Sequence, residues 1–278
     1  MFVARKLIVS LAFALLTNSV SAGSLLYVST FAGKFGTLDP TTGAFSQIGP
    51  TLADPVVGLV QGSNGYLGVS LSGNLDSVNP STGVVSVIGA TGLGTYADST
   101  AELGGTVYET DFYGNLYTVN TKTGAASLIG YTGIPSVPAY LAKLGNNLFD
   151  DEALFGVGGK LYATFDVFNI STSSAVFGPE LYQINPTTGA ATIVGSTAPY
   201  IDAVAEVGGT VYAFTAADQV LSLDLATGNT AFVNNYDSAA SFITGAVATP
   251  EPASLALLGT GIATVLIFQR RRHRGPAS

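Results

Sequence analysis

The chain has 278 residues, of which 47% are apolar and only 10% charged, with 34 Gly and 12 Pro. This balance is typical of many short strands joined by turns, and it excludes a charge-rich helical protein. Between residues 23 and 249, four lysines and no arginine stand against 17 acids, which gives this body a net charge of −13. Because phosphate binding requires a basic face, nucleic acid is excluded as a partner.

Missing residue types exclude several kinds of site. The chain has no Cys, and its single His, His273, lies in a basic tail. Disulfides, thiol catalysis, a Ser-His-Asp triad and a His-based zinc site in the body are therefore excluded. Trp is also absent, although 13 Tyr and 15 Phe remain. The lack of Trp disfavours a strong sugar-stacking platform.

The first 22 residues have the three parts of a secretory signal. Arg5 and Lys6 precede an apolar run over residues 7–16, and small residues follow at 20–22. This order predicts a signal peptide over residues 1–22, cut by signal peptidase between Ala22 and Gly23. The alternative is an uncleaved anchor helix, but ten apolar residues are too few to span a bilayer.

One hairpin pattern then recurs five times. In each copy an alternating apolar run ends in Asn or Asp, often followed by Pro, then a Thr-Gly turn follows, and a second run usually closes on Ile-Gly or Val-Gly. The copies cover residues 35–49, 74–89, 115–130, 180–195 and 220–234. This pattern is typical of strand, tight turn and strand. The turn glycines, which are Gly43, Gly83, Gly124, Gly189 and Gly228, are spaced 40, 41, 65 and 39 residues apart.

A period near 40 with four strands per period is typical of a propeller blade. The other two strands precede each hairpin, as a Gly-x-Leu/Val-Tyr element such as 209–212 and a shorter strand such as 203–207. The sequence thus predicts an all-β domain over residues 23–248, a five-bladed β-propeller with four strands per blade. The first copy lacks its innermost strand, and a solitary strand over 241–247 follows the last copy. We expect this C-terminal strand to pair with the N-terminal blade and close the ring.

The 65-residue interval carries about 25 more residues than the others, in 135–150 and 166–179. We expect long loops of the fourth blade there. The alternative is a sixth blade, because residues 144–149 resemble the Gly-x-Leu-Tyr element.

Residues 249–278 form a tail of a different composition. Pro250, Glu251 and Pro252 are followed by 253–268 without a charge, and then by a cluster that includes Arg270, Arg271 and Arg272. The two prolines end the last strand, and the apolar run predicts a short transmembrane helix. Arginines hold such a helix end in the cytoplasm, so the body would face outward.

The tail resembles the PEP-CTERM sorting domain of Gram-negative bacteria in its Pro-Glu-Pro motif, its short apolar segment and its arginine-rich end. The resemblance implies a sorting signal processed by an exosortase-type enzyme, in organisms that make exopolysaccharide and biofilm. It implies nothing about the activity of the attached domain. We therefore expect transient anchoring in the inner membrane, delivery to the cell surface or extracellular matrix, and a structural or adhesive role that involves exopolysaccharide.

Three carboxylates occupy one repeat position, ten residues before the Tyr of the second strand: Asp98, Glu152 and Asp202. The same count gives Gly58 in the second repeat. At the mouth of a central channel they could bind Ca²⁺, or they could act as acid and base on a sugar. The simpler interpretation is that a polar residue starts the innermost strand where it meets water. Because an enzyme site usually breaks a repeat, we expect a non-catalytic protein, with a glycosidase as the alternative and Ca²⁺ as the one candidate cofactor.

Overall fold

The structure is a computed structural model that describes residues 25–63, 65–134, 148–169 and 174–249. Leu25–Ala248 forms one compact unit. The predicted signal peptide with its cleavage site, the predicted membrane helix and the arginine cluster lie outside the described residues.

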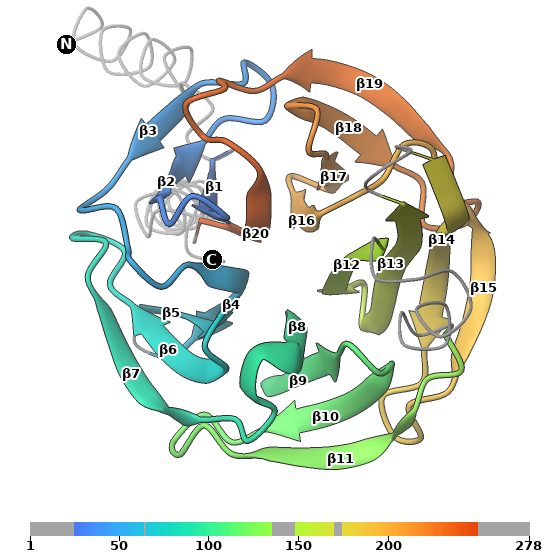
Figure 1. Cartoon of the computed structure of the whole chain (residues 1–278). Coiled ribbons are helices and arrows are strands. Elements are labelled where there is room, and N and C mark those ends of the chain that lie inside the picture. The colour runs from blue at the N-terminus through green and yellow to red at the C-terminus, as the bar shows by residue number, and fades with distance from the viewer. Residues whose placement is uncertain (1–24, 64, 135–147, 170–173, 250–278) are drawn as a thin grey trace, which may run out of the picture. The chain divides into compact units, whose positions relative to one another are not determined.

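The compact unit is a ring of five antiparallel four-stranded sheets, each of which is one blade (Figure 1). Blade one contains β20 (Ile243–Ala248), β1 (Leu26–Thr30), β2 (Phe35–Leu38) and β3 (Phe45–Gln47). Blade two contains β4 (Val56–Gly62), β5 (Gly65–Ser70), β6 (Asn74–Val78) and β7 (Val85–Ala90). Blade three contains β8 (Ala97–Leu103), β9 (Thr106–Asp111), β10 (Asn115–Val119) and β11 (Ala126–Tyr131), with a 3-10 turn over Gly94–Tyr96 before it. Blade four contains β12 (Leu148–Val157), β13 (Lys160–Asn169), β14 (Ser174–Ile184) and β15 (Ala191–Ser196), and blade five contains β16 (Ala203–Val207), β17 (Thr210–Phe214), β18 (Gln219–Leu223) and β19 (Thr230–Asn235).

The predicted closure of the ring is confirmed. β20 is the innermost strand of blade one and pairs with β1 from Leu26–Ala248 to Thr30–Ile243. The two ends of the ring therefore complete one sheet, so neither leaves an open edge. The alternative of a sixth blade is wrong, because the described strands form five sheets. Leu148 and Phe149, which suggested a sixth blade, begin β12, the innermost strand of blade four.

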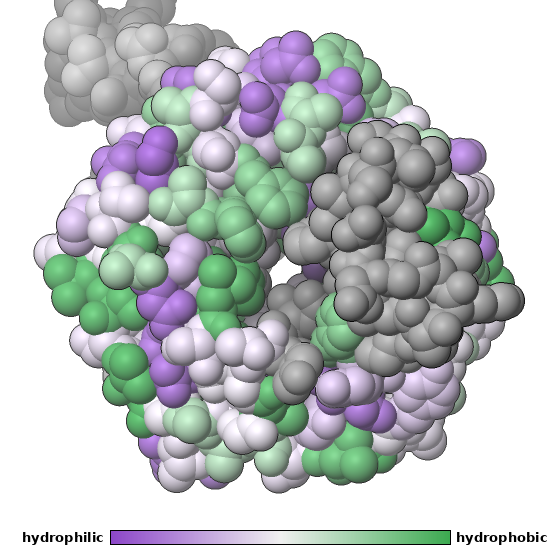
Figure 2. All heavy atoms as spheres, viewed as in Figure 1, coloured by the Kyte–Doolittle hydropathy of each residue, from purple (hydrophilic) through white to green (hydrophobic). Residues whose placement is uncertain are grey.

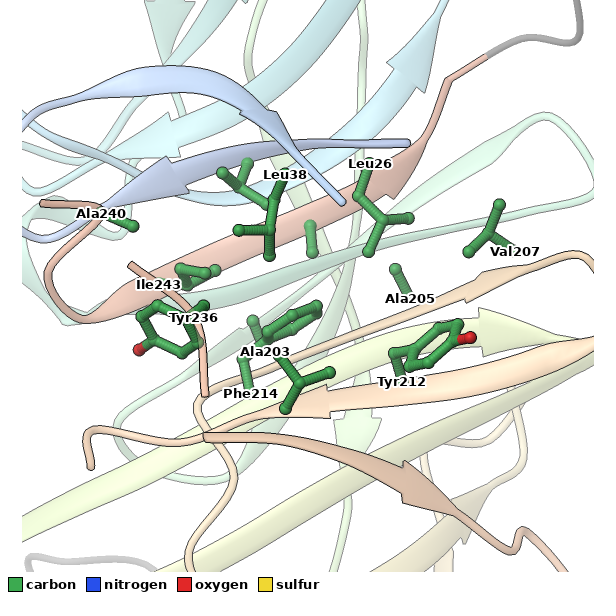
Figure 3. Close-up of a cluster of buried hydrophobic side chains, with 13 residues drawn as sticks. Leu26, Leu38, Ala203, Ala205, Val207, Tyr212, Phe214, Tyr236, Ala240 and Ile243 are labelled. Carbon is green, nitrogen blue, oxygen red and sulfur yellow. The ribbon is translucent and has the colours of Figure 1, made fainter. Parts of the chain in front are cut away.

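The core lies between neighbouring blades. Where blades one and five meet, Leu26, Leu38 and Ile243 pack against Tyr212 and Phe214 (Figure 3). Burying one such large side chain stabilises the fold by about 1.5–3 kcal/mol. Closure therefore depends on this apolar contact as well as on the hydrogen bonds between β20 and β1.

Blade four differs from the expectation of a long loop over 166–179. β13 extends to Asn169 and β14 begins at Ser174, so much of this segment belongs to two long strands. The reason is apolar alternation, because Phe165, Val167 and Phe177 pack in the core shared with blade three. The expected loop over 135–147 lies outside the described residues.

A backbone contact joins each blade to the next at the rim, and in four of the five cases both residues are glycine. The Thr-Gly turn of one blade meets the end of the outer strand of the preceding blade. A Cβ on Gly124 would lie 2.2 Å from the Gly89 oxygen, and a Cβ on Gly89 would lie 2.1 Å from the Thr123 oxygen. The same contact joins Gly83 to Gly49, Gly189 to Gly130, and Gly228 to Gly195, while Gly43 meets Asn235. The Thr-Gly and Ile-Gly elements of the repeat are therefore the two halves of one contact.

Replacing Gly124 with Ala should destabilise the protein more than replacing Gly105 with Ala. Both glycines have positive φ angles, 82° and 84°, so both variants carry about 1–2 kcal/mol of backbone strain. A Cβ on Gly105 meets nothing within 4 Å, whereas on Gly124 it also forces the blades apart. We expect about 1–3 kcal/mol of additional loss at Gly124, measured by urea unfolding. Equal losses would mean that the contact is not tight.

Candidate functional site

The innermost strands of the five blades surround a central channel. Its cavity of about 210 Å³ is lined by segments of β4, β8, β12 and β20 and by Asp202–Glu206 at β16. Figure 2 shows the opening at the centre of the ring, with apolar side chains along part of its border. The channel is therefore the hollow into which the predicted carboxylates could project.

Of the three candidate carboxylates, Asp202 is among the residues that line this channel. Its side chain is 6% exposed and lines the cavity, and its backbone N–H donates to the Phe214 oxygen at 2.9 Å. Glu152 lies in β12 opposite Phe165 and is partly buried just before the lining segment. The next residue pairs in the same way in both blades, Ala153 with Thr164 and Ala203 with Phe214, each two residues beyond the Tyr of its blade. Glu152 and Asp202 therefore occupy the same register position.

Asp98 departs from this register. It lies in β8, where the pairing shifts between Ala97 and Thr100. The side chain of Asp98 is outside the described residues. Among the side chains that the structure describes, no group of three or more His, Asp or Glu could hold a metal ion. The three-carboxylate Ca²⁺ site thus stays a prediction.

Glu109 is a buried carboxylate that the sequence analysis missed. It lies in β9 opposite Thr100 and Tyr117, with an exposed fraction of 0%. Neither of its carboxylate oxygens has a hydrogen-bond partner in the part of the chain that the structure describes. The sequence contained a signal for Glu109, because the equivalent positions of the other four blades hold uncharged residues, which are Val28, Gly68, Ala163 and Ala213.

Burial is the larger cause and the nearby Asp111 carboxylate the smaller one, and together they raise the pKa of Glu109 to about 8. Asp111 is itself satisfied: it accepts from the backbone N–H of Tyr113 at 3.0 Å, the backbone N–H of Asn115 at 2.8 Å and the Tyr117 hydroxyl at 2.8 Å. Glu109 is therefore mostly protonated at neutral pH.

Asp76 is a second buried carboxylate that was missed. It lies in β6 opposite Gly68 and Val87, and it is 3% exposed. The matching positions hold Gly36, Tyr117, Tyr182 and Leu221. Asp76 and Glu109 thus break a repeat that otherwise places small, apolar or aromatic residues at these positions.

Solved structures resemble the ring only distantly. The glutaminyl cyclase of Myxococcus xanthus is 16% identical over 74% of this chain and 74% of its own, with a TM-score of 0.40. The protein YjhT is 13% identical over 68% of each chain, with a TM-score of 0.46. No curated protein sequence matches the chain.

The tail matches a known family. Residues 248–272 match the family described as the PEP-CTERM protein-sorting motif, as the tail resemblance predicted. Among the described residues no helix is long and apolar enough to cross a membrane, and the predicted span over 253–268 is not among them. The motif is a substrate signal for exosortase-type processing, and it indicates an exported protein with a membrane-anchored C-terminal tail. The chain thus carries a PEP-CTERM protein-sorting motif that follows a five-bladed β-propeller.

Proposed function

We propose that this protein is a non-catalytic structural or adhesive component of the cell surface or extracellular matrix that holds exopolysaccharide. Its sorting motif supports export to that location. Signal peptidase and an exosortase-type enzyme would process the two ends of the chain, and the propeller would remain as the binding body.

The observation that carries this proposal is an apolar side chain repeated around the rim. It stands at the same register position of the outer strand in four blades, opposite Asp76, Tyr117, Tyr182 and Leu221. We call these four residues the apolar rim: Val87, Leu128, Ile193 and Phe232, which are 66%, 63%, 53% and 60% exposed. If these side chains packed against the C–H faces of sugar rings, each Å² of apolar surface that they bury would contribute about 25 cal/mol to binding.

Repetition suits a polymer better than a small substrate. A polysaccharide presents the same sugar unit many times, and the rim presents similar side chains at regular intervals around the ring. Several weak contacts on one polymer multiply into useful affinity through their high effective concentration. The outer strands that carry the rim also contain one β-bulge each in these four blades, which protects them from pairing with other sheets.

The competing function is a glycosidase that uses the channel carboxylates. The matched register of Glu152 and Asp202 favours it, because two carboxylates are the usual requirement of that chemistry. Polysaccharide from the producing organism separates the two functions: full-length protein in detergent should be retained on the immobilised polymer without releasing sugars.

Replacing Leu128 and Ile193 with Ser should weaken this retention. If each lost contact removes about 1 kcal/mol, the affinity falls about fivefold per site. The matched control replaces Leu25 and Val84, which are 42% and 52% exposed but lie outside the rim, and it should bind normally. Full retention by the rim variant would contradict the proposal, and release of sugars that Asp202→Asn abolishes would support the glycosidase.

A further inference from the structure

A group of oxygen atoms lies at the start of blade two, where the chain enters β4 and where β5 turns into β6. Asp54 precedes β4 and is exposed, whereas Asp76 in β6 is 3% exposed. The Leu71 N–H donates to the Pro55 oxygen at 3.1 Å and fixes these two loops against each other. One carboxylate is therefore open to water and the other is closed off from it.

A chain of hydroxyl groups extends from one carboxylate toward the other. The Ser72 hydroxyl donates to Asp54 Oδ2 at 2.6 Å, and it lies 3.1 Å from the Ser70 hydroxyl. Asn74 Nδ2 donates to Ser72 Oγ at 2.8 Å. The Ser70 hydroxyl in turn interacts with the Asp76 carboxylate and lowers its pKa. Two loops thus bring two carboxylates, two hydroxyls and one amide to a single place.

These groups hold more acceptor oxygens than hydrogens to satisfy them. Ser70 has a single hydroxyl hydrogen, but Ser72 Oγ, the Asn74 oxygen at 3.5 Å and Asp76 all compete for it. Asp76 Oδ1 is buried without a hydrogen-bond partner among the described residues. A buried carboxylate oxygen with no donor costs free energy unless a cation or proton faces it.

The described lysines do not supply that charge. Lys34, which lies in the neighbouring blade one, donates its Nζ to the Ala239 oxygen at 2.5 Å. Lys122 belongs to a turn of blade three, and Lys160 begins β13 of blade four. Within the described ranges there is no arginine. Burial and the Asp54 carboxylate raise the pKa of Asp76 to about 6, so a proton does not neutralise it above pH 7.

We propose that Asp54 and Asp76, with oxygen atoms of Ser70, Ser72 and Asn74, bind one Ca²⁺ ion at the boundary of blades one and two. Carboxylate, hydroxyl and amide oxygens are the ligands that hard cations take, and Ca²⁺ tolerates an irregular set completed by water. Asp76 stands where the other blades have Gly, Tyr or Leu, so the fold does not require a carboxylate there. The proposal is independent of the polysaccharide function and of the three channel carboxylates.

Calorimetric titration of CaCl₂ into full-length, chelator-treated protein in detergent at pH 7.5 tests this site. We expect one saturable site with a Kd of roughly 10⁻⁴–10⁻³ M, the range of extracellular calcium modules. NaCl at matched ionic strength should not reproduce the signal, because diffuse screening does not saturate at one ion.

Asp76→Asn and Asp54→Asn should each weaken calcium binding by roughly 10- to 100-fold or more. Glu109→Gln is the matched control, since it neutralises a buried carboxylate of the next blade boundary, and it should bind calcium normally. Because Asp54 is exposed, Asp54→Asn gives a result even if Asp76→Asn fails to fold. Calcium binding that survives Asp54→Asn, that only Asp202→Asn removes, or that does not exceed the sodium response would overturn the proposal.

Discussion

Replacing Glu109 with Gln should stabilise the protein above pH 8 by roughly 3–5 kcal/mol and leave its stability near pH 4 almost unchanged. The folded protein holds this carboxyl at a pKa of about 8, mainly because of burial. The unfolded chain has the ordinary value of about 4.3. Raising the pH from about 4.5 to 8 therefore charges Glu109 more readily in the unfolded state, and the wild-type protein loses stability over that interval.

Gln keeps the shape and the hydrogen-bonding side chain but cannot ionise. The difference in unfolding free energy between variant and wild type should thus grow from pH 4.5 to 8 and then level off, as measured by urea unfolding at each pH. Asp76, with its own raised pKa, contributes the same sign of pH dependence in both proteins and cancels in the difference. Glu206→Gln, at an exposed position of β16, is the control and should follow the wild-type curve. Parallel curves for the Glu109 variant and wild type would show that Glu109 is not held protonated.

Ending the chain at Asn235 should make the protein aggregate, whereas ending it at Thr249 should leave a soluble monomer. The shorter chain loses β20, which leaves one edge of β1 unpaired. It also loses Tyr236 and Ile243 from the core between blades one and five, at about 2–5 kcal/mol for each large side chain. This loss approaches the total stability of roughly 5–15 kcal/mol that a domain has. Size-exclusion chromatography with light scattering distinguishes the two outcomes.

A peptide with the sequence of residues 236–249, which contains Tyr236 and β20, provides the control for this experiment. If the missing strand is the cause, adding the peptide during refolding should restore a monomeric ring, and a scrambled peptide should not. Equal solubility of both truncated chains would contradict closure by β20 as the source of stability.

The strands could be predicted from the sequence because each repeat contains the alternating apolar runs of its strands and the glycine of the turn between them. Closure by the last strand could also be predicted, since one blade lacked an inner strand and one strand had no blade. The contact between Gly124 and Gly89 could not be predicted, because it joins residues of different blades that no local sequence pattern connects. The prediction of a long loop over 166–179 in blade four was wrong. The segment has the apolar alternation of a strand, but that alternation does not match the repeat.

The candidate site was predicted less well than the fold. Counting along the repeat selected Asp202 through its spacing from the Tyr of its blade, and the structure places it at the channel. The same comparison applied to every position would have found Glu109 and Asp76, since both are carboxylates among small, apolar or aromatic equivalents. Counting along the repeat could not predict the hydrogen bond from Ser72 to Asp54, because it depends on how two loops fold against each other.

The pairing of Leu26 with Ala248 also has a mechanical consequence. The sorting motif begins at residue 248, where β20 ends. Tension on a tether attached there acts on the end of β20, and a load at the end of an antiparallel pair separates its hydrogen-bonded residues one after another. The first pair to part would be Leu26 and Ala248, followed by the other four pairs of β1 and β20. The pulling force that the attached protein withstands is thus set by these five residue pairs together with the packing of Ile243 and Ala246 in the core between blades one and five.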